Sequence, residues 1–354
     1  MAVTIRDVSM HCGLSVSTVS KALNNYPDIS GETRRRVLHV AQEIGYFPNA
    51  LARGLKTNRT YNLGVILDDE LKDSLLHTYF ITILNGFKRE AEMAGYDITL
   101  INHNIGGQTL SYLDHCRYRN VDGICLMCLD FFAPEIVGLI GSDLALVTID
   151  HQFPDRDCIH SDNRAGVNEL VDYIVEMGHR RIAFVHGTPS VVTDVRLAAF
   201  HEAIQRHGLT VPEEYIVSGH YHSTAHGREV TQQLLSLKER PSLIMMSDDY
   251  SALGAIELIH EMGLRIPEDI SITGYDGTAM IQKIRPKLTT LFQDGEEIGR
   301  RAAIRLLERI EQPPAPVRPA DMVPGKLLCG QTVLDLNGSK SADWLRAHGG
   351  AASF

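Results

Sequence analysis

Two groups of residues have the types that metal sites use. Cys125 and Cys128 form a CxxC pair, and the densest group among the 16 histidines is His220, His222 and His226. The cysteines lie in the apolar run GICLMCL, which is typical of a buried strand, and residues three apart on a strand point to opposite faces. The histidines lie in a polar, loop-like segment. We therefore expect core thiols and a solvated histidine surface, with zinc as the less favoured alternative.

The motifs of nucleotide-dependent and hydrolytic enzymes do not occur in the sequence. The first predicted strand continues as LGVILDDEL, without the GxGxxG of dinucleotide-binding folds, and neither a GxxxxGK[ST] phosphate loop nor a GxSxG nucleophile turn is present. We therefore expect a protein that is not an enzyme, with no catalytic residue, no cofactor and no metal.

The charges of the chain are distributed unevenly. Residues 1–60 contain eight Lys and Arg against four Asp and Glu, which gives +4, whereas the remainder carries −14. The run Arg34, Arg35, Arg36 lies in this basic part. A basic head on an acidic body is typical of a protein that presents one end to phosphates.

The length of 354 residues exceeds the usual domain size of about 100–200 residues, so two or three folding units are expected.

The basic head has the pattern of a helix-turn-helix. Thr4 and Asp7 can form a capping box for a first helix, which Gly13 ends, and Ser15 can cap a second helix. A third helix is predicted from Ser30 to about Ile44, with these residues buried: Val37, Leu38, Val40, Ala41 and Ile44. The alternative is an ordinary helical hairpin. The small residues at the exposed start of the second helix and the arginine run favour DNA binding.

From Leu63 onward, predicted strands and helices alternate. The strands of a first series are NLGVIL, YDITLIN, DGICLMCL and LALVTID, and those of a second series are RIAFVHG, EEYIVSG, SLIMMSD and ISITGYD. Helices are predicted near 79–94, 109–119, 134–141, 164–177, 194–207, 225–237, 250–262 and 295–310. Two successive series predict two doubly wound parallel-sheet lobes, with ligand chemistry at the carboxyl ends of the strands. The fold class is therefore α + α/β.

Four charged residues lie where a cleft between the two lobes would gather them. Asp150 and Asp276 end predicted strands, Asp248 follows the strand SLIMMS, and Arg196 lies in the helical segment TDVRLAAF. Carboxylates paired with an arginine suit the vicinal hydroxyls of a sugar. Each also has a structural alternative, because an Asp at a strand end is often a helix N-cap and Arg196 can pair with a neighbouring acid.

Several motifs in the same order resemble the lac repressor family of bacterial transcription regulators. They are TIRDV, SVSTVSKALN, ISGETRRRV, GYFPNALARGL, DNRAG, MGHRRIAFV and SDDYSALGA, and the resemblance runs from Val3 to about Val333. It implies a repressor that binds a palindromic operator in double-stranded DNA as a homodimer. The implied domains are a helix-turn-helix head at 1–47, a hinge helix and linker at 48–60, two periplasmic-binding-protein-like lobes at 61–335 that bind effector and dimerise, and a loose tail at 336–354.

The resemblance also implies roles for single residues. Those that face DNA are Thr4, Val16, Ser17, Thr18, Lys21, Asn49, Ala50, Leu55 and Lys56. Leu55 corresponds to a leucine that is wedged into a central base step of the minor groove, and Gly54 replaces a common serine and weakens the hinge helix. The implied effector-binding residues are Tyr79, Phe80, Asp150, Arg196, Asp248 and Asp276. A phosphorylated effector needs more cations than Arg196 alone, which favours neutral sugars.

Two departures and one rival interpretation accompany the resemblance. The segment after Arg196 is LAAF rather than the common LAGF, and the stretch DDELKDSLLHTYF after the first strand is long and polar, so that Asp68 or His77 can reach the effector. The rival is a transport-type sugar-binding protein or a sugar-acting enzyme without DNA-dependent regulation. The basic head, and the lack of a signal segment or of about 18 uninterrupted apolar residues, favour a cytoplasmic regulator without a membrane partner.

Overall fold

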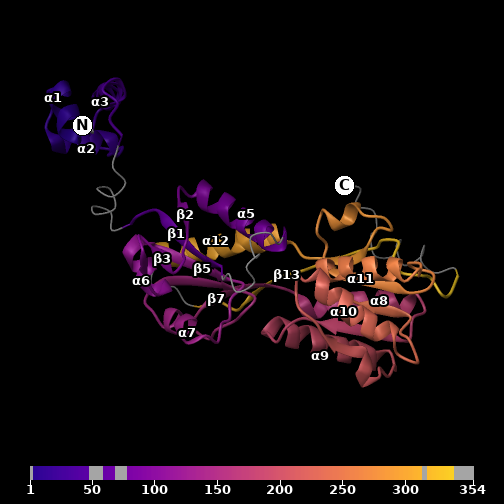
Figure 1. The fold of residues 1–354 in the computed structure, drawn as a ribbon. Helices are drawn as coiled ribbons and strands as arrows, with labels where there is room; N and C mark the ends of the chain where they lie inside the picture. Colours follow the sequence, from indigo (N-terminus) through magenta and orange to yellow (C-terminus); the bar gives the residue numbers. More distant parts are fainter. Residues whose placement is uncertain (1–2, 48–58, 68–77, 313–316, 339–354) are drawn as a thin grey trace. The chain divides into compact units, whose positions relative to one another are not determined.

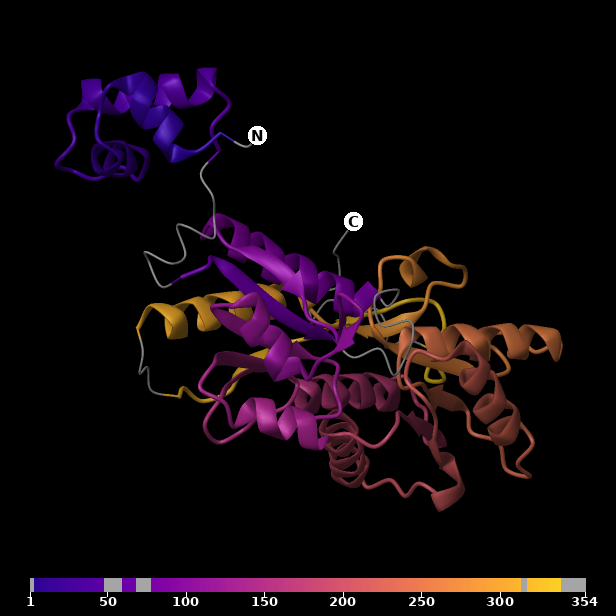
Figure 2. The same cartoon turned by 60° about the vertical axis from the view of Figure 1, so that its left-hand side comes forward.

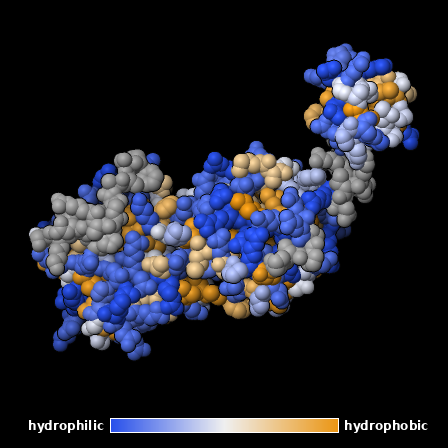
Figure 3. All heavy atoms as spheres, turned by 180° about the vertical axis from the view of Figure 1, so that it is seen from behind, coloured by the Kyte–Doolittle hydropathy of each residue, from blue (hydrophilic) through white to orange (hydrophobic). Residues whose placement is uncertain are grey.

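A computed structural model describes residues 3–47, 59–67, 78–312 and 317–338. The chain divides after Asn62 into two compact units (Figure 1). No helix in these ranges is long and apolar enough to cross a membrane. Figure 3 shows one face of the second unit, where hydrophilic residues dominate and apolar residues form small groups.

The first unit is a bundle of three helices, α1 (Ile5–Cys12), α2 (Val16–Leu23) and α3 (Gly31–Glu43). Each helix begins at its predicted cap, since the Asp7 carboxylate accepts from the Thr4 backbone N–H at 2.7 Å and the Ser15 and Ser30 hydroxyls accept from the third residue of α2 and α3. The core consists of Val8, Cys12, Val19, Ala22, Val37 and Ala41. Leu38, which was expected in this core, is 48% exposed because its neighbour Val37 takes the inward direction.

The second unit contains two six-stranded sheets, each the centre of one lobe (Figure 2). Lobe 1 has the strand order β13-β7-β6-β5-β1-β2. The pairs β13–β7, β7–β6, β6–β5 and β5–β1 are parallel. Its strands are β1 (Asn62–Leu67), β2 (Asp97–Leu100), β5 (Gly123–Met127), β6 (Ala145–Ile149), β7 (Asp157–Ser161) and β13 (Asp321–Val323). Its helices are α5 (Thr78–Met93), α6 (Tyr112–Arg119), α7 (Pro134–Ile140) and α12 (Gly295–Glu311).

Lobe 2 has the strand order β14-β12-β11-β10-β8-β9, in which only β14 is antiparallel to its neighbour. Its strands are β8 (Ile182–His186), β9 (Ile216–Ser218), β10 (Leu243–Met245), β11 (Ser271–Asp276), β12 (Thr289–Phe292) and β14 (Lys326–Leu328). Its helices are α8 (Asn163–Glu176), α9 (Val191–Arg206), α10 (Thr224–Leu235) and α11 (Asp249–Glu261). The short strands β3 (Asn104–Ile105) and β4 (Gln108–Thr109) form a separate hairpin.

The lobes are not two successive halves of the chain, which corrects the simplest form of the prediction. The described chain passes between them at 162, at 293–294 and at 324–325. Helix α12 and strand β13 therefore return to lobe 1, where α12 lies against α5. The predicted strands do not include β7, β12, β13 and β14, because these short strands mix polar and apolar residues and lack a long apolar run.

Glycines allow one close helix pair in each lobe. A methyl group on Gly299 of α12 would lie 1.9 Å from the Ile83 carbonyl of α5, and one on Gly254 of α11 would lie 1.9 Å from the Thr224 carbonyl of α10. The two backbones of each pair are thus in direct contact, which leaves no room for a Cβ.

Candidate DNA-binding and effector sites

The start of α2 presents the expected recognition residues. Val16 is 41% exposed and Ser17 is exposed, while the half-buried Thr18 has its hydroxyl 2.8 Å from that of the capping residue Ser15. A helix that begins with small side chains can approach base edges closely. The exposed Thr4 caps α1.

Lys21 is engaged within the head. Its Nζ donates to Asp28 Oδ2 at 2.5 Å, and this hydrogen bond raises the pKa of Lys21 and lowers the pKa of Asp28. Both side chains are solvent-exposed, so the pair is screened by salt and a phosphate can compete with Asp28 for the ammonium group.

Two of the three consecutive arginines support the head. Arg34 donates to the Tyr26 carbonyl at 2.8 Å and Arg36 donates to the Cys12 carbonyl at 2.7 Å, whereas Arg35 is exposed. Part of the basic run therefore holds backbone rather than being reserved for phosphates. The DNA-facing predictions for Asn49, Ala50, Leu55 and Lys56 lie outside the described residues, as do Asp68, His77 and residues 339–354 of the tail.

In the second unit, Asp150 and Asp276 both stand at carboxyl ends of strands with a left-handed backbone. Asp150 follows β6 at φ +63° and Asp276 ends β11 at φ +106°. Non-glycine residues rarely adopt such values, which cost of order 1–3 kcal/mol each and concentrate at ligand sites. Burial raises the pKa of both carboxyl groups, and the nearby Arg196 guanidinium opposes that increase.

Arg196 of α9 is buried and held in place by neutral groups. Its Nε donates to Asn163 Oδ1 at 2.7 Å, its Nη1 to the Ser247 carbonyl at 3.1 Å and its Nη2 to Gln293 Oε1 at 3.5 Å. The guanidinium carbon lies 3.7 Å from the centre of the Tyr275 ring. A stacked arginine that uses three of its five N–H groups on the protein keeps donors for a ligand.

The two predicted aromatic residues occupy the first turn of α5. Tyr79 is buried, and among the described residues its hydroxyl has no hydrogen-bond partner. Burial raises the pKa of Tyr79 well above its usual value, and the charges of Asp150 and Asp276 raise it further. The Phe80 ring lies 5.5 Å from the His222 ring of lobe 2, edge to face. The helix α5 of lobe 1 therefore faces the polar residues of lobe 2.

Asp248 is the N-cap of α11. Its Oδ1 accepts from the Ser251 N–H at 2.9 Å, and its Oδ2 accepts from the His222 N–H at 3.0 Å and from the hydroxyls of Ser247 and Ser251. Both oxygens are therefore occupied by the protein, and Asp248 shapes the loop that carries His222.

Several residues of this site were not anticipated from the sequence. His222, which was expected on a solvated surface, is half-buried beside Asp248 and Phe80, and burial lowers its pKa. Tyr221 directs its ring toward Arg196 and its hydroxyl lies 2.9 Å from that of Thr193. Both follow β9 at its carboxyl end. The expectation that ligand residues lie at the carboxyl ends of parallel strands, which selected Asp150, therefore applies to them as well. Among the described residues, no group of three His, Cys, Asp or Glu side chains is placed to hold a metal ion.

Comparisons with known proteins agree with this arrangement of head and lobes. Residues 4–49 match the family of bacterial regulatory proteins, lacI family, and residues 171–333 match the periplasmic binding protein-like domain. The repressor PurR of Pectobacterium carotovorum is 32% identical over 314 residues, covering 87% of this chain and 90% of PurR. Catabolite control protein A of Priestia megaterium is 31% identical and covers 87% of this chain and 92% of its own.

The solved structures point the same way. A Lac repressor dimer bound to operator and the anti-inducer ONPF has a TM-score of 0.80 at 27% identity, covering 94% of this chain and all of that one. A complex of the regulator CelR with cellobiose, at 23% identity and a TM-score of 0.67, covers 93% of this chain and 99% of its own and shares the fold. The head and the two lobes are those of a ligand-responsive DNA-binding regulator. The chain belongs to the lacI family of bacterial transcription regulators, a family of regulators rather than enzymes, and its relative PurR is a repressor.

Proposed function

We propose that the protein is a cytoplasmic repressor that binds a palindromic operator as a homodimer and responds to a neutral, sugar-like effector. The observation that carries the effector part is the group formed by Asp150, Asp276 and Arg196. The two carboxyl groups lie at the carboxyl ends of strands and interact electrostatically with the Arg196 guanidinium. Asp276 and Arg196 are buried, and Asp150 is half-buried. The Lac repressor neighbour, a dimer on operator DNA, supports the DNA part. The proposed domains are the helix-turn-helix head at 1–47, the hinge helix and linker at 48–60, the two lobes at 61–335 and the tail at 336–354.

The operator is read by the exposed start of α2. Val16, Ser17, Thr18 and Lys21 contact base edges and phosphates, with Thr4 at the backbone. Asn49, Ala50 and Lys56 belong to a hinge segment that orders on DNA, and Leu55 inserts into the minor groove. These assignments rest on the family membership and on the exposure of the residues in α2.

The charge balance of the effector site favours a neutral polyol. Arg196 is the single cation among the proposed effector-binding residues, so a phosphorylated ligand lacks the cationic partners it needs. Sugar hydroxyls, in contrast, can donate to Asp150 and Asp276 and accept from Arg196. Tyr79 offers a further hydroxyl, Phe80 offers an apolar ring face, and Asp248 fixes the loop that carries His222. The complexes of family neighbours with cellobiose and ribose are compatible with this class.

Effector binding favours one relative arrangement of the lobes and thereby alters operator affinity. The coupling free energy between effector binding and operator binding cannot exceed the difference in effector-binding free energy between the two arrangements.

The test is a thermal-shift screen of the full chain against ribose, cellobiose and glucose 6-phosphate. A neutral sugar is expected to raise Tm by several degrees, and the phosphate is not. Arg196→Ala and Asp276→Ala should remove the shift and the operator response while both variants still bind operator DNA.

Arg206→Ala on the same helix is the matched control, because the exposed Arg206 contacts Asp172 rather than the cluster. A sugar shift that survives in both site variants would contradict the proposed effector site. Loss of operator binding in both would show a folding defect instead.

A further inference from the structure

The segments that connect the two lobes carry side chains into the effector site. Asn163 is the first residue of α8, directly after the connection at 162, and Gln293 lies in the connection at 293–294. Both side chains are buried, at 6% and 4% exposure. Neither was expected from the sequence to contribute to the site.

Arg196 is bonded to both connections at once. It donates to Asn163 Oδ1 at 2.7 Å and to Gln293 Oε1 at 3.5 Å. The second distance is at the outer limit of a hydrogen bond, so this contact is the weakest that Arg196 makes. A ligand oxygen that approaches the Nη groups therefore competes first with Gln293.

Gln293 also holds the second charged ligand residue. Its Nε2 donates to Asp276 Oδ1 at 2.7 Å, and its backbone N–H donates to the Asp276 carbonyl at 3.1 Å. One amide thus accepts from a guanidinium and donates to a carboxylate, which neither a glutamate nor an alkyl side chain can do.

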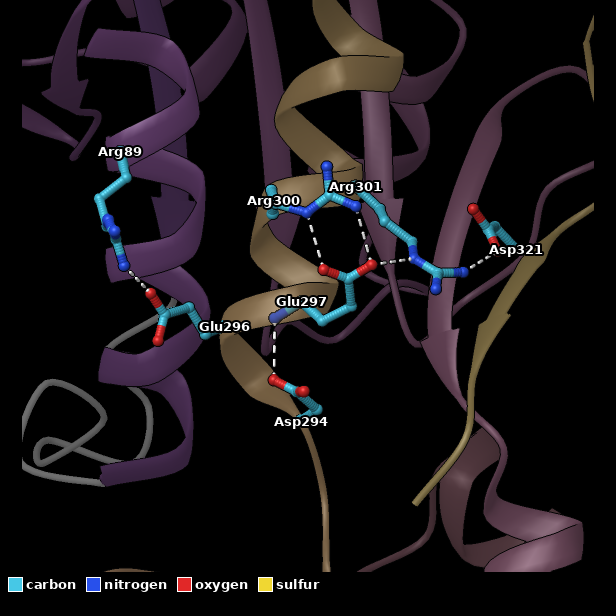
Figure 4. A network of polar contacts seen from close by, with 7 residues as sticks. All are labelled: Arg89, Asp294, Glu296, Glu297, Arg300, Arg301 and Asp321. Atoms are coloured by element: carbon cyan, nitrogen blue, oxygen red, sulfur yellow. Dashed lines mark hydrogen bonds and ion pairs between the residues drawn. The ribbon is translucent and has the colours of Figure 1, made fainter. Parts of the chain in front are cut away.

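The other end of this connection is fastened to lobe 1 (Figure 4). Asp294 caps α12 by accepting from the Glu297 N–H at 3.0 Å, and Glu297 accepts from Arg300 and Arg301 at 2.7 Å. Arg301 continues to Asp321 of β13 at 2.7 Å, next to the connection at 324–325. An ion pair between Arg89 and Glu296 fixes α12 to α5. A displacement of Gln293 is therefore passed to lobe 1 rather than absorbed at the start of α12.

We propose that Gln293, supported by Asn163, is a positioning residue that couples effector occupancy to the arrangement of the lobes. Without effector, the Gln293 amide joins Arg196 and Asp276 and holds the connection at 293–294 in one position. An effector hydroxyl that hydrogen-bonds to Arg196 and Asp276 displaces the Gln293 amide. The connection at 293–294 can then move. The inference rests on the proposed effector site for the ligand, but the amide bridge itself belongs to the chain without ligand.

The first experiment needs no effector. Spin labels at Tyr118→Cys in lobe 1 and Met262→Cys in lobe 2, both exposed positions, report the distance between the lobes by pulsed electron paramagnetic resonance of the full chain. The half-buried Cys128 and Cys329 are replaced by serine in this background. Gln293→Ala should broaden or shift the distance distribution, and Asn163→Ala should do so less. An unchanged distribution in Gln293→Ala would overturn the proposal whatever the effector is.

Matched substitutions separate the bridge from a general loss of stability. Gln233→Ala on the exposed face of α10 and Asn168→Ala on α8 should leave the distribution as in the unsubstituted chain. Gln293→Glu places a carboxylate against Asp276 and should behave like Gln293→Ala. The double change Gln293→Glu with Asp276→Asn restores one donor and one acceptor with exchanged roles, and it should narrow the distribution again.

The second experiment uses whichever of ribose and cellobiose raises Tm of the unsubstituted chain. Gln293→Ala should still bind that sugar, while the change of operator affinity on adding it should fall by about tenfold in fluorescence anisotropy. An undiminished response would contradict the coupling role. If neither sugar binds the unsubstituted chain, the proposed effector class fails, and the distance measurements alone decide on the bridge.

Discussion

At the scale of single residues, the proposed effector site combines a strained backbone with local support. Asp276 at φ +106° is followed by Gly277 at φ +67°, so the chain turns sharply at the end of β11. Asp249 holds this turn, since its Oδ2 accepts from the Thr278 N–H at 2.7 Å and its Oδ1 accepts from the Thr290 hydroxyl at 2.6 Å. The residue beside the N-cap Asp248 therefore supports Asp276 without facing the ligand.

Asp249 should make stability depend on pH. Burial raises its pKa from 3.8 to about 7, so the folded chain binds a proton more tightly than the unfolded chain. This contribution to stability is complete below pH 3.8 and is lost as pH rises through about 7, with an upper bound of about 4 kcal/mol. We expect Asp249→Asn, whose amide can accept from Thr278 and donate to Thr290, to remove this term.

The measurement is the urea midpoint at pH 5 and pH 8. Through Asp249, the free energy of unfolding of the unsubstituted chain should be lower at pH 8 than at pH 5. In Asp249→Asn this decrease should be smaller. Asp269→Asn on the surface serves as control, because Arg265 lowers the pKa of Asp269 below 3.8. This carboxyl group therefore stays ionised from pH 5 to pH 8, and its replacement should leave the pH dependence in that range unchanged. A pH dependence in Asp249→Asn equal to that of the unsubstituted chain would show that another group titrates.

At the scale of elements, the helix pairs determine how firmly each lobe holds together. Helix α12 begins at Gly295, two residues after Gln293, and lies against α5, whose first turn carries Tyr79 and Phe80. The contact between α5 and α12 therefore positions one side of the proposed effector site. Gly299 makes this contact possible, since a Cβ there would lie 1.9 Å from the Ile83 carbonyl.

Gly299→Ala should consequently destabilise lobe 1 by about 1–3 kcal/mol, the usual cost of overpacking. Gly138→Ala in α7 is the matched control, because nothing lies within 4 Å of its added Cβ and alanine favours a helix by about 1 kcal/mol. Calorimetry of the full chain should show a lower Tm for Gly299→Ala and an equal or higher Tm for Gly138→Ala. Equal values for the two variants would contradict the close approach of α5 and α12.

At the scale of the whole molecule, the proposed repressor depends on two copies of a weakly binding head. The start of α2 is small, and the ammonium group of Lys21 is shared with Asp28. Few strong base contacts are therefore available to one head, and most affinity must come from the paired heads and the hinge segment.

A fragment of residues 1–46 should bind the operator at least about a hundredfold more weakly than the full chain, because it loses the avidity of the dimer. Fluorescence anisotropy at several salt concentrations measures both affinities. The affinity of the full chain should fall steeply with salt, and Lys21→Ala should reduce that slope by about two, one for each head of the dimer. Tight binding by the fragment would contradict this account, and circular dichroism shows whether its three helices are intact.

The sequence by itself determined the elements that have strong local signals. The capping residues Thr4, Ser15 and Ser30 and the apolar runs of the inner strands place α1 to α3 and most parallel strands where they are found, because these signals act over a few residues. The strand-end rule also selected Asp150 and Asp276, which the fold brings to one arginine. The family could be recognised because its motifs occur in order.

Only the tertiary structure decided how the chain passes between the lobes and which side chains that path brings together. No local pattern distinguishes α12 and β13 as parts of lobe 1, since their place depends on contacts with α5 and β7 far away in the sequence. Asn163 and Gln293 are ordinary polar residues in the sequence, and His222 was expected in solvent. Asn163 and Gln293 join the site because both reach Arg196 from connections between the lobes, and His222 joins it because the loop after β9 lies against Phe80 of α5. Contacts between such distant segments exist only in the folded chain.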